Sequence, residues 1–121
     1  MSNYGHYQYQ YYSKKNMFPI ESFLIDGISH YQKNLININY DSKIIMCLDI
    51  NNKYDKQAIE ILYNSNTIGY VPNTEIIKKL CLENINTNLK IINIKKDNES
   101  NNFGIRVIPE KYFNDDLICI F

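Results

Sequence analysis

The chain has 121 residues, which fits one domain and leaves no room for a second of ordinary size. Thirteen Lys and Arg balance thirteen Asp and Glu, so the formal net charge is zero. This balance argues against a general polyanion-binding protein, which usually carries a large positive excess.

The first 17 residues differ from the rest in composition. Tyr7, Tyr9, Tyr11 and Tyr12 are separated by polar residues, and no aliphatic residue lies between Met1 and Met17. We expect residues 1–17 to form a flexible, Tyr-rich tail, with an edge strand as the alternative because Tyr alternating with Gln suits a pleated surface. The folded domain is expected over 18–121.

From Phe18 onward, short apolar or alternating segments between polar breaks are typical of strands. The predicted strands cover residues 21–28, 35–40, 43–50, 58–63, 67–71, 88–95, 103–108 and 117–121. Asn64-Ser65-Asn66 predicts a hairpin between two of them, and Gly69 is expected where bulk does not fit the strand. The pattern predicts a mainly β fold of the α+β class. Its form is a small bent sheet or β-barrel of about six or seven strands, with one helix after the central hairpin.

The predicted helix runs from about Asn73 to Asn84. Pro72 precedes it, and Asn73 can act as the N-cap. Helical spacing predicts a buried face of Ile76, Ile77, Leu80 and Cys81 and an opposite face that carries Lys78 and Lys79.

The residues that would carry catalysis or a metal are sparse. No nucleotide-binding or zinc-protease motif is present, and the only histidines are His6 and His30. Asp49 and Asp55 flank a polar loop, where two acids are usually solvated. Cys47, Cys81 and Cys119 lie among apolar residues and are expected to be reduced core thiols. We therefore expect no enzyme, no cofactor and no metal site.

The cellular location is predicted from what the chain lacks. No apolar run approaches the roughly 18 residues that cross a membrane, and the first residues lack the apolar stretch of a signal peptide. We expect an intracellular protein with no membrane partner, cytoplasmic, or nuclear if it comes from a eukaryote or a virus.

Two stretches in the middle of the chain resemble the HIRAN family. The first is the loop and strand from Asn52 through Tyr54 and Asp55 to Ile61, and the second is Ile68-Gly69-Tyr70-Val71-Pro72, which leads into the predicted helix. Upstream, Gly27-Ile28-Ser29-His30-Tyr31 is similar to the family's Gly-x-x-x-Tyr segment. The resemblance covers roughly residues 21–108, with the segments in the family's order and spacing.

The resemblance implies a compact barrel-like domain that holds the free 3′ end of single-stranded DNA. It implies that Tyr54 stacks on the terminal nucleotide, that Asp55 accepts a hydrogen bond from the 3′-hydroxyl, and that Tyr31 and Tyr70 line the pocket. Asn52, His30 and Lys56 complete the expected nucleic-acid-binding set. A carboxylate repels phosphate but accepts a hydroxyl donor, and an aromatic face stacks on any base.

This chain departs from the family at two positions that contact phosphates. Ser29-His30 stands where DNA-binding members carry an Arg and an aromatic residue, and Pro72-Asn73 stands where they carry a basic residue. His30 would replace a cation only when protonated, and the neighbouring Lys33, Lys53 and Lys56 can compensate.

Two other functions remain open from the sequence. The first is a protein-interaction module, such as a viral or mobile-element inhibitor of a host defence or repair factor. The second is binding of a small nucleotide in the same pocket. Salt dependence separates strand binding from protein binding. Self-association also stays open, because exposed strand edges can pair.

Overall fold

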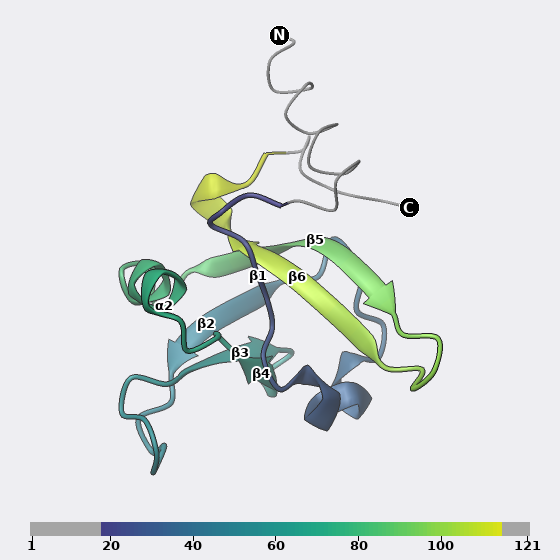
Figure 1. Ribbon diagram of the computed structural model, residues 1–121, viewed down its shortest axis with the longest axis horizontal. Helices are drawn as coiled ribbons and strands as arrows, with labels where there is room; N and C mark the ends of the chain where they lie inside the picture. Colours follow the sequence, from purple (N-terminus) through teal and green to yellow (C-terminus); the bar gives the residue numbers. More distant parts are fainter. Residues whose placement is uncertain (1–17, 115–121) are drawn as a thin grey trace, which may run out of the picture.

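The computed structural model describes residues 18–114. In chain order the elements are β1 (Phe23–Leu24), the 3-10 helix η1 (Ile28–Leu35), β2 (Ile44–Leu48), β3 (Ile59–Tyr63), β4 (Asn66–Tyr70), α2 (Glu75–Leu82), β5 (Asn88–Lys96), β6 (Phe103–Pro109) and the 3-10 turn η2 (Glu110–Tyr112). The six strands form one antiparallel sheet in the order β1-β6-β5-β2-β3-β4. The sheet is strongly curled (Figure 1), which confirms the predicted bent-sheet, barrel-like fold.

A single bridge joins the two ends of this sheet. The N–H of Asp26, just after β1, donates to the carbonyl of Tyr70 at 2.8 Å, and the N–H of Tyr70 donates to the carbonyl of Asp26 at 2.9 Å. Since β1 and β4 are the outermost strands in the sheet order, this pair of hydrogen bonds closes the curled sheet.

Gly69 makes this closure sterically possible. A Cβ at this position would lie 2.3 Å from Cγ2 of Ile25 and 2.6 Å from the carbonyl oxygen of Asp26. Both distances are far inside van der Waals contact. The expectation that bulk does not fit at Gly69 is therefore confirmed, and the reason is the close passage of the chain after β1.

The core lies inside the curled sheet and follows from the alternation of side chains along each strand. Ile44 and Met46 of β2 and Ile59 and Ile61 of β3 are almost fully buried. Burying one such side chain stabilises the fold by about 1.5–3 kcal/mol. Most of the core comes from the sheet, and η1 contributes Leu35 as its one buried residue.

The prediction of a strand at residues 35–40 is wrong. Residues 28–35 form η1, and Asn37 then adopts a left-handed φ of 65°, which no regular strand allows. The predicted alternation also fails for burial, because Leu35 is buried while Ile36 is 70% exposed, and the segment packs as a loop. The Tyr40 hydroxyl accepts a hydrogen bond from the Ile94 N–H at 2.9 Å, so this loop satisfies a donor on β5.

Replacing Tyr40 with Phe should destabilise the fold by about 1–2 kcal/mol, because it removes the partner of the Ile94 N–H while keeping the ring. Urea unfolding should show a lower midpoint with an unchanged slope. An unchanged midpoint would mean that water replaces the hydroxyl at no cost.

The strand at 21–28 is shorter than predicted, while those predicted at 43–50, 58–63, 67–71, 88–95 and 103–108 are close to expectation. The strand ends at Leu24, and Gly27 turns the chain with a φ of 71° before η1. Asn64 and Ser65 both have positive φ, 51° and 65°, as a type I′ hairpin turn requires. The predicted tail at 1–17 and strand at 117–121 lie outside the described residues.

Side chains of η1 cover the exposed edges of two strands. The amide of Gln32 both accepts from the Phe103 N–H at 2.7 Å and donates to its carbonyl at 3.0 Å. Asn34 donates to the carbonyl of Thr67 on β4 at 2.8 Å. These bonds occupy edge groups through which a second chain could add a strand.

The described residues include no helix of the length and apolar character that crossing a membrane takes.

Candidate functional site

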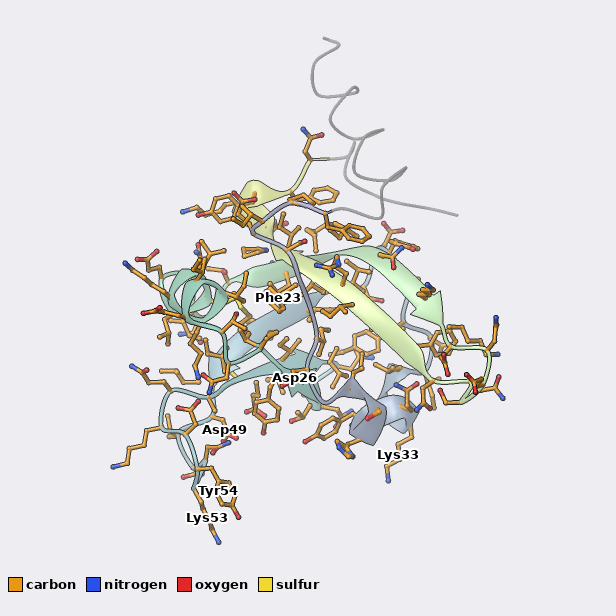
Figure 2. All side chains as sticks on the ribbon, viewed as in Figure 1. Phe23, Asp26, Lys33, Asp49, Lys53 and Tyr54 are labelled. Carbon is orange, nitrogen blue, oxygen red and sulfur yellow. The ribbon has the colours of Figure 1, made fainter. Side chains whose placement is uncertain are left out.

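The predicted site residues lie on the loop between β2 and β3, on η1 and at the end of β4. The loop, residues 49–57, projects from the barrel (Figure 1), with Asp49 at its base and Lys53 and Tyr54 at its tip (Figure 2). The structure therefore brings residues from three separate segments to one end of the molecule.

Side-chain hydrogen bonds fix the shape of this loop. The Asn52 Oδ1 accepts from the N–H groups of Tyr54 and Asp55, both at 2.9 Å. The Asp55 Oδ1 accepts from the Gln57 N–H at 2.9 Å. Asn and Asp favour such turns because their short side chains reach the backbone two or three residues on. Tyr54 is left 97% exposed on a backbone that its neighbours hold in place.

Asp55 also joins the loop to α2. The Lys78 Nζ forms an ion pair with the Asp55 Oδ2 and donates to the Asn73 Oδ1 at 3.2 Å. The Lys78 side chain is 11% exposed and that of Asp55 37%. The hydrogen bond from Lys78 and that from the Gln57 N–H hold the pKa of Asp55 below its usual value.

The predicted orientation of the helix is correct for Ile77 and Cys81, which face the core, and for Lys79, which is exposed, but two other residues are reversed. Lys78, assigned to the outer face, is buried, whereas Ile76, assigned to the core, is 69% exposed. The helix is only eight residues long, and Thr74 rather than Asn73 precedes it as the cap residue. Apolar spacing could not reveal that the partner for Lys78 lies 23 residues away in the loop.

The Asp55–Lys78 ion pair should make the free energy of unfolding depend on pH in the acid range. Because the folded-state pKa of Asp55 is lowered, its contribution is present above the unfolded-state value of about 3.9 and is lost as pH falls through the folded-state pKa. Thermal unfolding between pH 2 and 7 should show a smaller acid-side loss in Asp55→Asn than in the wild type. Identical pH profiles for the two proteins would contradict the pairing.

A second carboxylate, Asp49, connects the loop to Tyr70. The Tyr70 hydroxyl donates to the Asp49 Oδ2 at 2.9 Å, and Asn52 Nδ2 donates to the same oxygen at 3.3 Å. Burial, the hydrogen bond to Asp49 and nearby charges raise the pKa of Tyr70, and Tyr31 is close enough to contribute. That Tyr31 and Tyr70 line one pocket stays a prediction.

The remaining predicted residues are solvent-exposed. His30 on η1 and Lys56 in the loop are exposed, as are Lys33 and Lys53. Arg106, the one arginine of the chain, lies on β6 instead. Its guanidinium sits 4.4 Å from the centre of the Phe18 ring, and it donates to the Ser22 hydroxyl at 3.2 Å.

Sequence reasoning missed the structural roles of Asp49, Asn73 and Lys78. Asp49 was expected to be solvated, yet it is half-buried and accepts hydrogen bonds from Asn52 and Tyr70. Its place at the end of a buried strand was the available signal. Lys78 gave none, because its partner Asp55 lies 23 residues away, and Asn73 takes part only through Lys78.

The two described cysteines differ from one another. Cys81 is fully buried, and burial raises its pKa to about 12, as expected of a core thiol. Cys47 is only half-buried on the outer face of β2, where its thiol lies 3.7 Å from the Glu60 carboxylate. Burial and Glu60 raise the Cys47 pKa as well. Cys119 lies outside the described residues.

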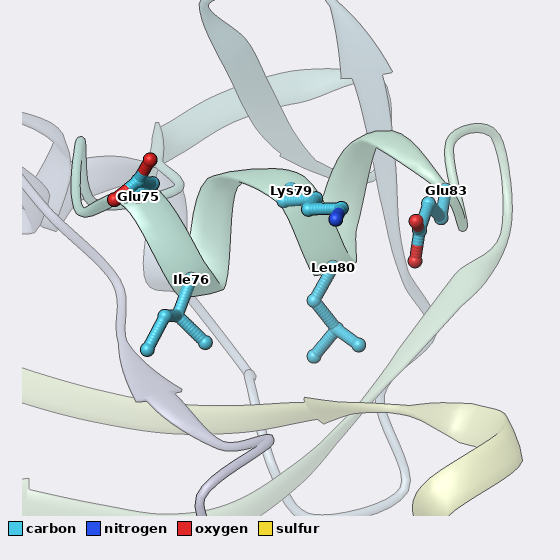
Figure 3. A pocket seen from close by; sticks show the side chains of 5 residues that line it. All are labelled: Glu75, Ile76, Lys79, Leu80 and Glu83. Carbon is cyan, nitrogen blue, oxygen red and sulfur yellow. The ribbon is translucent and has the colours of Figure 1, made fainter.

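A shallow pocket lies elsewhere, on the outer side of α2. Glu75, Ile76, Lys79, Leu80 and Glu83 line it, and Ile76 and Leu80 point the same way from the helix (Figure 3). Within residues 18–114, no three His, Cys, Asp or Glu side chains group as metal ligands do.

Comparison of the chain with protein-family models, curated proteins and solved structures finds no match. The resemblance to the HIRAN family therefore depends on the residues that carry it and stays a prediction.

Proposed function

We propose that this protein is a non-enzymatic module that binds the free 3′ end of single-stranded DNA at the loop 49–57. The observation that carries the proposal is Tyr54, an aromatic side chain 97% exposed on a loop whose backbone is fixed. An exposed aromatic ring on a fixed backbone provides a stacking surface at little conformational cost. Nothing in the packing of the barrel requires that ring.

The groups around Tyr54 suit the end of a strand. Asp55 keeps 37% of its side chain exposed despite the ion pair, and each carboxylate oxygen can accept more than one hydrogen bond. A 3′-hydroxyl is a donor that such a group accepts, whereas a 3′-phosphate would be repelled. Lys33, Lys53 and Lys56 are exposed and available to the phosphates.

A second candidate is a protein-interaction module, favoured by Ile50. This side chain is 78% exposed in the same loop as Tyr54, and exposed apolar side chains of this size can anchor protein interfaces. A small nucleotide is the third candidate, because one stacked base and one hydroxyl ligand would suffice.

Fluorescence anisotropy with short oligonucleotides that end in a 3′-hydroxyl or a 3′-phosphate tests the proposal. Binding should require the hydroxyl and weaken as salt rises. Binding of neither oligonucleotide at low salt would contradict it and favour a protein partner. Equal binding of a nucleoside monophosphate would favour the small nucleotide.

The role of Asp55 needs a variant that separates binding from folding. Asp55→Ala alone leaves the Lys78 ammonium buried without the Asp55 carboxylate, so it should lower both the stability of the fold and the affinity for DNA. In the double variant Asp55→Ala/Lys78→Met both charges are gone, and most of the stability should return. If Asp55 contacts the 3′-hydroxyl, end binding stays lost in the double variant. Recovered binding would show that Asp55 only holds the loop.

A further inference from the structure

The outer side of α2 carries an apolar strip that faces solvent. Ile76 is 69% exposed and Leu80 is half-buried, and both line the shallow pocket on this side. Their side chains point the same way from the helix, one turn apart (Figure 3). Exposed apolar side chains that line a pocket between charged residues are typical of a surface at which proteins associate.

A row of alternating charges borders this strip. Glu75, Lys79 and Glu83 follow one another at intervals of four residues, so they lie along one side of the helix (Figure 3) and line the same pocket. All three are exposed, and within residues 18–114 no ion pair involves any of them. The row is therefore available to charges that another molecule brings.

The charge row is complementary to its own reverse. When two helices pack antiparallel about a two-fold axis, the same flank of each helix faces the other. With the axis at the level of Ile77, Glu75 lies opposite Lys79 of the second copy, and Lys79 lies opposite Glu75 of the second copy. Since the helix rises 1.5 Å per residue, the two Ile76 side chains then meet near the axis, and each Leu80 packs against Ile76 of the other copy.

We propose that the outer side of α2 is a self-association surface, at which two copies of this chain pair antiparallel. The formal net charge is zero, so the two copies carry no overall repulsion. Because α2 has only eight residues, we expect less contact area than the roughly 800 Å² per partner of a standard interface, and hence a weak dimer. The pairing is independent of the proposed function, since the loop 49–57 is joined to α2 through the buried Lys78.

Sedimentation equilibrium of the full chain between about 10 μM and about 1 mM tests the pairing. The average mass of the wild type should rise with concentration toward twice the monomer mass. Lys79→Glu and Glu75→Lys each place like charges opposite one another, so each should weaken association at least about tenfold in Kd. Lys43→Glu is the matched control, because it makes the same charge change as Lys79→Glu at an exposed residue just before β2 and should associate as the wild type does.

A mixture of the two charge variants tests the antiparallel arrangement itself. Lys79→Glu carries acids at positions 75 and 79, and Glu75→Lys carries lysines at both, so the mixture should regain association that neither variant shows alone. A mixture that stays monomeric would overturn the antiparallel pairing.

Two further results would overturn the proposal as a whole. A wild type that stays monomeric at about 1 mM would show that the surface does not pair. Unchanged association in Lys79→Glu would place the contact elsewhere, such as at a strand edge. If a charge variant does not fold, as judged by its Tm, Ile76→Ala takes its place, because it removes the apolar contact at the axis and should weaken association as well.

Discussion

Replacing Tyr54 with Ala should weaken binding of a single-stranded 3′ end by about 1–3 kcal/mol, roughly 5- to 150-fold in Kd, because it removes the stacking surface. Stability should change by less than about 0.5 kcal/mol, since the side chain is 97% exposed and its bond to Asn52 is made by the backbone N–H. Anisotropy and thermal unfolding measure the two effects separately.

Two matched variants define this experiment. Tyr54→Phe keeps the ring and should retain most of the affinity. Ile76→Ala removes an apolar side chain of comparable exposure, 69%, from the outer side of α2 and should leave DNA binding unchanged. Equal loss in Tyr54→Ala and Ile76→Ala would mean that the loop tip has no special role, and full affinity in Tyr54→Ala would remove the main support for stacking.

Gly69→Ala should be the most damaging small substitution at the closure of the barrel. The added Cβ would lie 2.6 Å from a backbone oxygen that cannot move without breaking the Asp26–Tyr70 bridge. Overpacking lowers the free energy of unfolding by about 1–3 kcal/mol where side chains can adjust. We expect a loss of about 3 kcal/mol or more for Gly69→Ala, because the clash is with backbone. Tyr70 should be displaced as the bridge opens.

Urea unfolding gives the stability change, and binding measured well below the unfolding midpoint gives the functional one. Gly104→Ala is the matched control, because the nearest atom to its Cβ would be 3.9 Å away, an ordinary contact. A Gly69→Ala protein as stable as Gly104→Ala would contradict the account of how the sheet closes.

The sequence predicted the strands that bury a continuous apolar stripe and failed where tertiary contacts decide. β2, the β3–β4 hairpin, β5 and β6 follow from alternation and from turn residues with positive φ. Residues 35–40 alternate equally well, yet the loop that Asn37 turns is stabilised by Tyr40 reaching β5. No local pattern contains that contact.

For the candidate site, the sequence placed the residues together but assigned Asp55 a simpler environment than it has. The loop Asn52–Asp55 and the pair Tyr31 and Tyr70 were assigned by resemblance, and in the structure the loop is joined to Tyr70 through Asp49. The pairing of Asp55 with Lys78 and of Asp49 with Tyr70 joins segments more than 20 residues apart. Such pairings emerge only once the chain has folded.

Amide chemical-shift mapping of the ¹⁵N-labelled protein, titrated with a short oligonucleotide ending in a 3′-hydroxyl, tests the central claim most directly. The account predicts shifts concentrated in residues 30–31, in the loop 49–57 and around Tyr70, which largely disappear when the same strand ends in a 3′-phosphate. Shifts centred on the outer side of α2, or equal shifts with both ends, would contradict recognition of a strand end at this loop.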